Sequence, residues 1–207
     1  MTIYMFKDMQ NVICITNRHL LNDDMSLFFE RIAYLAKAKP YSIILREKDL
    51  SEHDYLSLAL RTSVLCSSSG TRFFVHNFPM AALKASAAGL HMPLHRLKEY
   101  IETNPAEAEL VRSRIEYLGA SCHSTEDAVL AESLGCNYIT AGHIFETDCK
   151  KGLPGRGPDF LKDVVQAVSI PVFAIGGIDE SNIEDIKKAG AAGACIMSSA
   201  MAPGDGG

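Results

Sequence analysis

Residues 171–177, PVFAIGG, form a continuous apolar run that ends in two glycines, and residues 41–47, YSIILRE, have a similar apolar run. A strand that is apolar on both sides is typical of a parallel sheet covered by helices on both faces. Six further strand-like runs alternate with longer amphipathic segments, at 11–17, 71–77, 89–94, 115–122, 137–143 and 193–198. Eight such units favour a (β/α)8 TIM barrel, although a doubly wound sheet also fits the alternation.

Helices are expected between these strands. In residues 25–35 the apolar side chains recur at spacings of three and four, as on one face of a helix, and residues 183–189 repeat this pattern. Ser51 with Asp54, and Ser124 with Asp127, have the spacing of a helix capping box. Glycines stand where helices are expected to stop, at positions 70, 89, 135 and 190.

The length of 207 residues predicts one TIM-barrel domain over residues 1–207, with residues 202–207 as a disordered tail. Only a few residues, rich in Gly and Pro, follow the last strand, so the eighth outer helix is expected to be missing. A second copy of the chain in a homo-oligomer is one way to cover that face.

The net charge of −5 gives little electrostatic support for nucleic-acid binding. Residues 1–10 lack the pattern of a secretory signal, and no apolar run has the length of a membrane span, so we expect a cytoplasmic protein without a membrane partner. The six cysteines are widely spaced and are expected to be reduced thiols; Cys149 is the one in a polar loop.

Polar residues gather where the predicted strands end, which is where TIM barrels place their working residues. These strand ends carry Thr16, Asn17, Arg46, Glu47, Lys48, His76, Asn77, His91, Cys122, His123 and His143. After the seventh and eighth strands come Gly176, Gly177, Ser198 and Ser199, which we expect to bind a phosphate group, with a helix starting at Asp179. His76 and His91 have an alternative structural role, as hydrogen-bond partners of the backbone.

The loop after the sixth strand, residues 143–157, holds Lys150, Lys151 and Arg156 among glycines and prolines. It is expected to be a mobile lid that brings positive charge to an anionic substrate, although a solvated loop has the same composition. His143 precedes this loop. An imidazole with its ordinary pKa of about 6.5 can both take and return a proton, so His143 is our candidate acid/base residue. Glu47 and Lys48 are rival proton carriers, although a structural ion-pair network, in which Arg46 and Lys48 hold Glu47 ionised, is the alternative for them.

Four segments resemble the thiamin phosphate synthase superfamily: LREKDLS (45–51), SCHSTEDAVLAESLG (121–135), GHIFETDCKKGLPGRG (142–157) and IPVFAIGGID (170–179). The third is particularly similar to TenI, the thiazole tautomerase. The resemblance implies that His143 is the catalytic residue, although some synthases also carry histidine there. It implies that the substrate is bound by Arg46, Lys48, Asn77, Ser121, His123, Thr147, Lys150, Gly177 and Ser198.

The sequence departs from the synthases where they bind magnesium. Their glutamine is Ile44 here, and their two metal-binding aspartates correspond to Phe78 and Arg96. Magnesium needs hard oxygen ligands, so no metal site is expected. Cys149 also replaces a threonine common in synthases.

The leading hypothesis is therefore an isomerase that aromatises a carboxythiazole phosphate by a proton shift at His143, without a cofactor. The alternatives are a magnesium-dependent thiamin phosphate synthase and a non-catalytic regulatory protein that binds the phosphorylated thiazole. A synthase assay and a His143→Ala variant would separate them.

Overall fold

The computed structural model describes residues 9–147 and 152–202. Its strands follow the eight apolar runs: β1 (Val12–Ile15), β2 (Ser42–Leu45), β3 (Phe73–His76), β4 (Gly89–Pro93), β5 (Tyr117–Cys122), β6 (Tyr138–Gly142), β7 (Val172–Ile175) and β8 (Gly193–Ile196). Their order is β1 to β8 in a closed barrel, with parallel pairing, for example Ile44 opposite Phe74 and Ala141 opposite Ala174. The predicted (β/α)8 TIM barrel is thus confirmed.

Helical segments follow every strand. They are α1 (Met25–Lys37), α2 (Glu52–Ser68), α3 (Pro79–Lys84), α4 (Leu94–Thr103), α5 (Pro105–Arg114), α6 (Thr125–Ser133), α7 (Gly157–Ala167), α8 (Ile183–Lys188) and α9 (Ser198–Met201), with 3₁₀ turns η1 (Met9–Asn11) and η2 (Arg18–Leu21). After β8 the described residues form the four-residue α9. No helix in the described ranges is long and apolar enough to cross a membrane.

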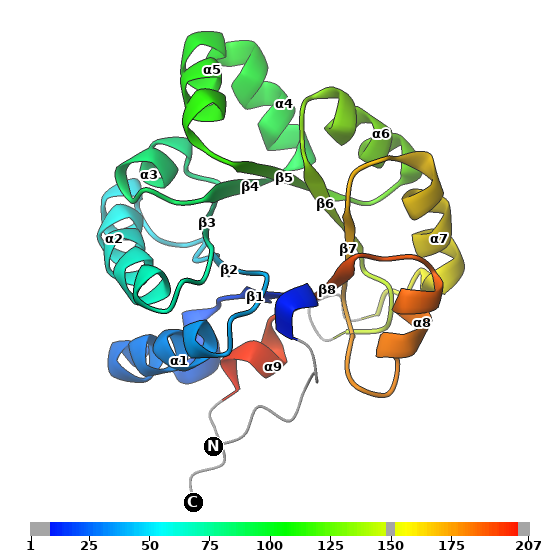
Figure 1. Ribbon diagram of the computed structural model, residues 1–207, viewed down its shortest axis with the longest axis horizontal. Helices are drawn as coiled ribbons and strands as arrows, with labels where there is room; N and C mark the ends of the chain where they lie inside the picture. The colour runs from blue at the N-terminus through cyan, green and yellow to red at the C-terminus, as the bar shows by residue number, and fades with distance from the viewer. Residues whose placement is uncertain (1–8, 148–151, 203–207) are drawn as a thin grey trace, which may run out of the picture. The chain divides into compact units, whose positions relative to one another are not determined.

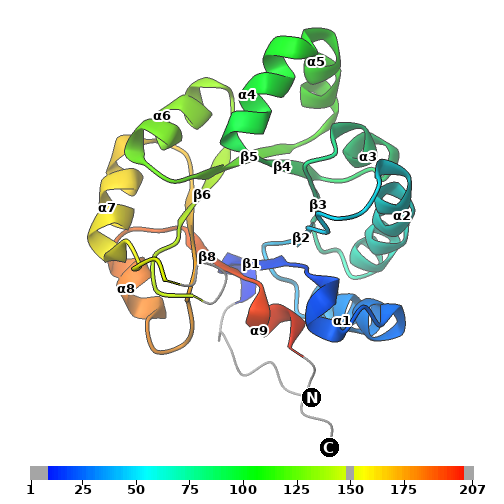
Figure 2. The same ribbon diagram turned by 180° about the vertical axis from the view of Figure 1, so that it is seen from behind.

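The chain divides into two compact units: residues 1–90 with 196–207, and residues 91–195. In the first unit, α1 and α2 lie outside strands β1 to β3, and α9 lies beside α1 (Figures 1 and 2). In the second unit, α6 and α7 lie outside β5 to β7 (Figure 1). Whether the chain behaves as one domain in solution stays a prediction, and the tail beyond Ala202 lies outside the described residues.

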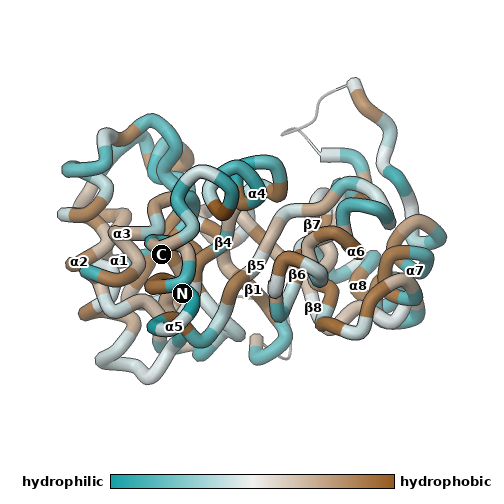
Figure 3. Tube along the Cα trace, turned by 90° about the horizontal axis from the view of Figure 1, so that it is seen from above, coloured by the Kyte–Doolittle hydropathy of each residue, from teal (hydrophilic) through white to brown (hydrophobic). Residues whose placement is uncertain are grey.

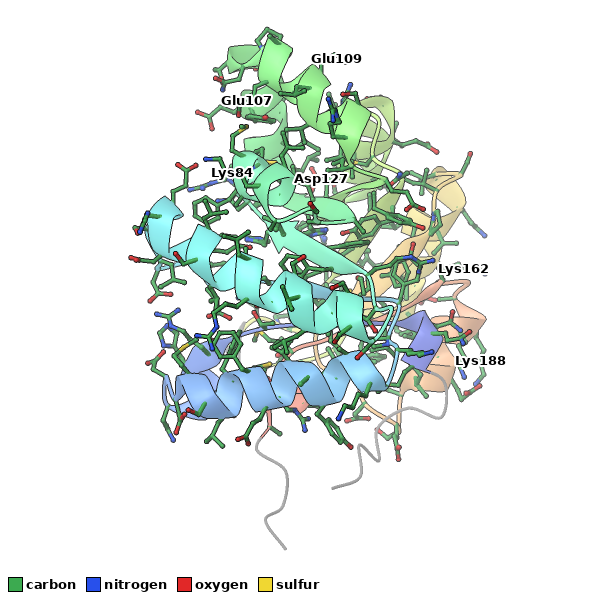
Figure 4. All side chains as sticks on the ribbon, turned by 60° about the vertical axis from the view of Figure 1, so that its left-hand side comes forward. Lys84, Glu107, Glu109, Asp127, Lys162 and Lys188 are labelled. Carbon is green, nitrogen blue, oxygen red and sulfur yellow. The ribbon has the colours of Figure 1, made fainter. Side chains whose placement is uncertain are left out.

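Hydropathy divides each unit into apolar strands and more polar helices (Figure 3). Strands β1 to β3 are buried at every residue, and so is β6. Charged side chains such as Lys84, Glu109 and Lys162 are exposed on the helices and point away from the strands (Figure 4). Burial of the strands on both faces is what their continuous apolar sequence predicts.

Most of the expected helix ends are confirmed. The Ser51 and Ser124 hydroxyls accept hydrogen bonds from the backbone N–H groups of Asp54 and Asp127, at 3.1 and 3.0 Å. Glycines 70, 135 and 190 have positive φ angles just after α2, α6 and α8. The expectation for Gly89 is wrong, because this residue begins β4; α3 ends earlier, and Ser86 takes the left-handed conformation there, with φ 49°.

Cysteines 14, 66, 122, 136 and 195 are free and buried, as expected for reduced core residues. Burial raises the pKa of the Cys14 thiol to about 12. A thiol with such a high pKa is a poor nucleophile at neutral pH. Cys149 lies outside the described residues.

Candidate active site

In the first unit, the ends of β1 and β2 are joined by a buried carboxylate. Glu47 is 2% exposed. It accepts hydrogen bonds from the Thr16 hydroxyl at 2.6 Å and from the backbone N–H of Arg18 at 3.1 and 3.2 Å. The guanidinium of Arg18 also donates to Glu47, at 3.2 Å. Glu47 therefore takes part in a structural ion pair, the alternative to a proton carrier, and its partner in the described structure is Arg18, which was not expected.

Arg18 is the centre of this cluster, and sequence reasoning missed it. Besides Glu47, its guanidinium binds both oxygens of Asp49, with one N–O distance of 2.6 Å, and lies 3.1 Å from an oxygen of Asp23. His19 also bonds Asp23, at 3.0 Å. The only signal in the sequence was a basic residue three positions after the end of β1, which a surface arginine would give equally well.

Arg46 follows β2 and is fixed at its backbone, because its N–H donates to the Thr16 hydroxyl at 2.9 Å. Its guanidinium reaches the sulfur of Met197 at 3.8 Å, just before Ser198. The structure therefore brings two predicted substrate-binding residues, Arg46 and Ser198, into the same neighbourhood. Lys48 is exposed on the loop after β2.

The end of β3 holds a polar acceptor next to an aromatic pair. Asn77 has a positive φ of 69°, and its buried Oδ1 has no hydrogen-bond partner among the described residues. Phe78 packs against Tyr55, with ring centroids 4.3 Å apart. The Tyr55 hydroxyl accepts from the backbone N–H of His76 at 2.9 Å and donates to the carbonyl of Leu45 at 2.5 Å. An unpaired buried acceptor like that of Asn77 is uncommon and suits a bound ligand.

In the second unit, a chain of hydrogen bonds runs through His91. Its ring nitrogens lie 3.0 Å from the hydroxyl of Tyr138 and 2.8 Å from that of Ser121. The Tyr138 ring takes the space beside Gly119, where any Cβ would overlap it. The expectation that His91 stands at a strand end is wrong, because it is the middle residue of β4 and only 4% exposed. Its contacts with Tyr138 and Ser121 are both with side chains.

Two further histidines follow adjacent strands, β5 and β6. Nδ1 of His123 lies 2.8 Å from the carbonyl of Gly142, and Nε2 of His143 lies 3.0 Å from the carbonyl of Pro154. A carbonyl oxygen can only accept, so each of these nitrogens carries a hydrogen. In a neutral imidazole this leaves Nε2 of His123 and Nδ1 of His143 as proton acceptors.

Gly176 and Gly177 allow the chain after β6 to pass close to the end of β7. Their φ angles are 102° and 63°, in the region that favours glycine. A Cβ on Gly176 would lie 2.8 Å from Cα of His143, and one on Gly177 would lie 2.9 Å from Cβ of Phe145. The backbone N–H of Phe145 donates to the Gly176 carbonyl at 3.0 Å. The glycine pair therefore holds His143 in place, a role that we had not predicted.

The predicted helix start at Asp179 is wrong. α8 begins at Ile183, because the Asp179 carboxylate accepts from the N–H and hydroxyl of Ser181, at 2.8 and 2.6 Å, which makes a turn instead. Ser198 is the first residue of α9, and Ser199 follows it. Any phosphate contact of Gly176 and Gly177 would therefore come from the loop and not from a helix end.

The structure describes only parts of the expected lid. Thr147 lies just before the gap at residues 148–151, and Lys150 lies outside the described residues. Past the gap, the backbone N–H of Arg156 donates to the carbonyl of His143 at 3.1 Å, and the Arg156 side chain lies over the Phe160 ring. This side of the loop is anchored, and its motion stays a prediction.

Comparison with known proteins gives the family. Residues 12–200 match the family described as thiamine monophosphate synthase. The chain is 34% identical to the thiamine-phosphate synthase of Methanoculleus marisnigri, over 84% of this chain and 81% of that one. It is 29% identical to that of Fusobacterium nucleatum, over 86% and 84% of the two chains.

A solved structure agrees with this result. The thiamine phosphate pyrophosphorylase from Pyrococcus furiosus superposes with a TM-score of 0.74 at 27% identity, covering 95% of this chain and 89% of that one. These relatives are named as synthases, which is the activity of our alternative hypothesis, and they confirm only the superfamily for the leading hypothesis. The chain belongs to the thiamine monophosphate synthase family, a family of enzymes.

Proposed function

We propose that this chain is a thiazole tautomerase, which aromatises a carboxythiazole phosphate by moving one proton. The observation that carries this proposal is the chemistry of two positions, Phe78 and Arg96, where the resemblance places the magnesium-binding aspartates of synthases. Phe78 is stacked on Tyr55, and Arg96 is an exposed cation in the first turn of α4. Neither offers a carboxylate oxygen, so these residues do not fit the synthase's metal site.

The substrate of this reaction carries a phosphate and a carboxylate. We assign the phosphate to Gly176, Gly177, Ser198 and Ser199, and the carboxylate to Arg46 or to a lysine of the 143–157 loop. The Oδ1 of Asn77, which has no hydrogen-bond partner in the described part of the chain, suits a donor on the ligand. The remaining residues that we propose as substrate contacts are Lys48, Ser121, His123, Thr147 and Lys150.

His143 is our candidate for the proton shift. Its Nε2 donates to Pro154, which orients the ring and leaves Nδ1 to take a proton from the ring carbon of the thiazole. The same proton then returns to the exocyclic carbon, so the reaction is an isomerisation with no net transfer of electrons. His123 has the same arrangement at the neighbouring strand end, where it either orients the ligand or shares the proton transfer.

Thiamin phosphate synthase is the second candidate, because the relatives that match most of the chain carry that name. It differs in substrates, since it joins a pyrimidine diphosphate to a thiazole phosphate with magnesium. A single incubation with these three components therefore tests it. We expect no thiamin phosphate; its enzymatic formation would favour the synthase and count against our proposal.

The direct test follows aromatisation of the carboxythiazole phosphate by absorbance, with the wild-type chain and three single variants. We expect His143→Ala to reduce kcat by about 10²–10⁴-fold, the usual contribution of a general acid/base. His53→Ala is the matched control, because His53 is an exposed histidine on α2, and it should retain wild-type turnover.

His123→Ala separates the two imidazoles. A larger loss of kcat in this variant than in His143→Ala would move the proton transfer to His123. Turnover that is unchanged in both variants would remove the histidine mechanism. A wild-type chain that does not accelerate aromatisation at all would remove the tautomerase itself.

A further inference from the structure

Arg31 is a buried arginine on the apolar face of α1. Its neighbours on that face, Phe28, Ile32 and Leu35, are completely buried, and Arg31 itself is 7% exposed. A charged side chain is rarely buried unless hydrogen bonds or an opposite charge compensate for its lost hydration. The position of Arg31 among apolar residues therefore needs an explanation.

Its partners lie in α9, at the far end of the sequence. Nε donates to the carbonyl of Ala200 at 2.5 Å, and Nη2 donates to the carbonyl of Ser199 at 3.1 Å. The guanidinium also lies over the Tyr34 ring, 5.3 Å from its centroid. No acidic side chain in residues 9–147 and 152–202 forms an ion pair with it. Arg31 is thus held by dipoles and keeps an uncompensated positive charge.

α9 needs such support. It has four residues, too few for a helix to be stable by its own hydrogen bonds. Figures 1 and 2 both place it beside α1, from which Arg31 reaches it. On its other side, Arg46 touches Met197. The two arginines therefore hold the segment that contains Ser198 and Ser199 from both ends.

We propose that Arg31 is a positioning residue for phosphate binding. It fixes the backbone of Ser199 and Ala200 so that Ser198 and Ser199 present their N–H and hydroxyl groups to the substrate phosphate. Its positive charge, which is hydrogen-bonded to the carbonyls of Ser199 and Ala200, favours a dianionic group bound by the same segment. This inference rests on the proposed function, in which both serines bind that phosphate.

The test compares two ligands, the aromatic thiazole phosphate and the corresponding thiazole alcohol, which lacks the phosphate. Their Kd values are measured by calorimetry for the wild-type chain, Arg31→Met and Arg31→Lys. We expect Arg31→Met to weaken binding of the phosphate by about tenfold or more, and binding of the alcohol by less than about twofold. Arg31→Lys keeps the charge but loses the forked donor, so it should recover part of the affinity.

Arg61→Met is the matched control. Arg61 also lies over an aromatic ring, that of Phe29, but it is exposed and makes no bond to α9 in the described structure. We expect it to leave both Kd values unchanged. Circular dichroism checks that each variant is folded; if Arg31→Met does not fold, Arg31→Lys carries the comparison.

Each result has one meaning. A loss of affinity confined to the phosphate supports the inference. Equal losses for both ligands, or no loss for the phosphate, would overturn it while the proposed function stands. If the wild-type chain binds the phosphate no better than the alcohol, the phosphate site of the proposed function fails first, and the role of Arg31 fails with it.

Discussion

The strand ends of the two units use opposite electrostatics. In the first unit, Arg18 is surrounded by Glu47, Asp49 and Asp23, so that charges of both signs are paired. In the second unit, His123 and His143 are held by neutral backbone carbonyls. An ion that is paired with an opposite charge is stabilised in its charged form. An imidazole that donates a hydrogen bond from one ring nitrogen can still accept a proton at the other nitrogen. We therefore propose a structural role for the first cluster and a chemical role for the second.

The largest effect is expected for a variant that disrupts the cluster of Arg18 and Glu47 in the first unit. Glu47→Ala would leave Arg18 and the Thr16 hydroxyl without their buried acceptor, and we expect a loss of about 3–5 kcal/mol in the free energy of unfolding. Urea unfolding at pH 7 measures it. Asp23→Ala is the control, because its half-exposed carboxylate touches the same Arg18 and should cost much less. Equal losses in the two variants would contradict a structural role that depends on burial.

The two clusters also show which structural features the sequence predicts and which features it cannot predict. The strands and helix caps follow from local patterns, as in residues 171–177 and at Ser51, and these predictions were confirmed. The positions of the polar strand ends follow from the fold class. The partners of each side chain do not, because they depend on residues far away in the sequence, as Glu47 and Arg18 illustrate.

Two errors have local causes, which differ from each other. The Asp179 carboxylate accepts hydrogen bonds from the N–H and hydroxyl of Ser181, so a turn forms and the helix begins later. At Gly89 a strand begins where the end of a helix was expected. The sequence also contains a signal for the buried Arg31, which the sequence analysis did not use. An arginine at the spacing of Phe28, Ile32 and Leu35 breaks the apolar face of α1, and such a break marks a buried charge with a distant partner.

A smaller effect is expected in the second unit, where hydrogen bonds link Tyr138, His91 and Ser121. Tyr138→Phe removes a hydroxyl that lies 3.0 Å from Nδ1 of His91, and leaves that nitrogen buried without its partner. We expect a loss of about 1–3 kcal/mol in the free energy of unfolding, measured in urea. Tyr100→Phe is the control, since its hydroxyl bonds Glu107 in a less buried place. A loss as large as that of Glu47→Ala would erase the difference between the units.

The smallest effect concerns the pH dependence of the first cluster. A hydrogen bond to Asp23 raises the pKa of His19 above its ordinary value of 6.5. The folded state thus holds this proton more tightly than the unfolded state does, so the resulting stabilisation is fully present below pH 6.5 and is lost as the pH rises through the raised pKa. Because His19 is exposed, we expect a small change.

The measurement compares the urea midpoints of the wild-type chain and His19→Asn between pH 5.5 and pH 8. The wild-type advantage should shrink as the pH rises over this range. The same comparison is repeated at high salt concentration. Because salt screens exposed charges, the difference in urea midpoint between the two proteins should then depend less on pH. Asp49 offers the opposite sign, since its pKa is held low by Arg18 and its contribution is lost only on acidification below its ordinary value of 3.8. A wild-type advantage that grows with pH would contradict a raised pKa of His19 in the folded state.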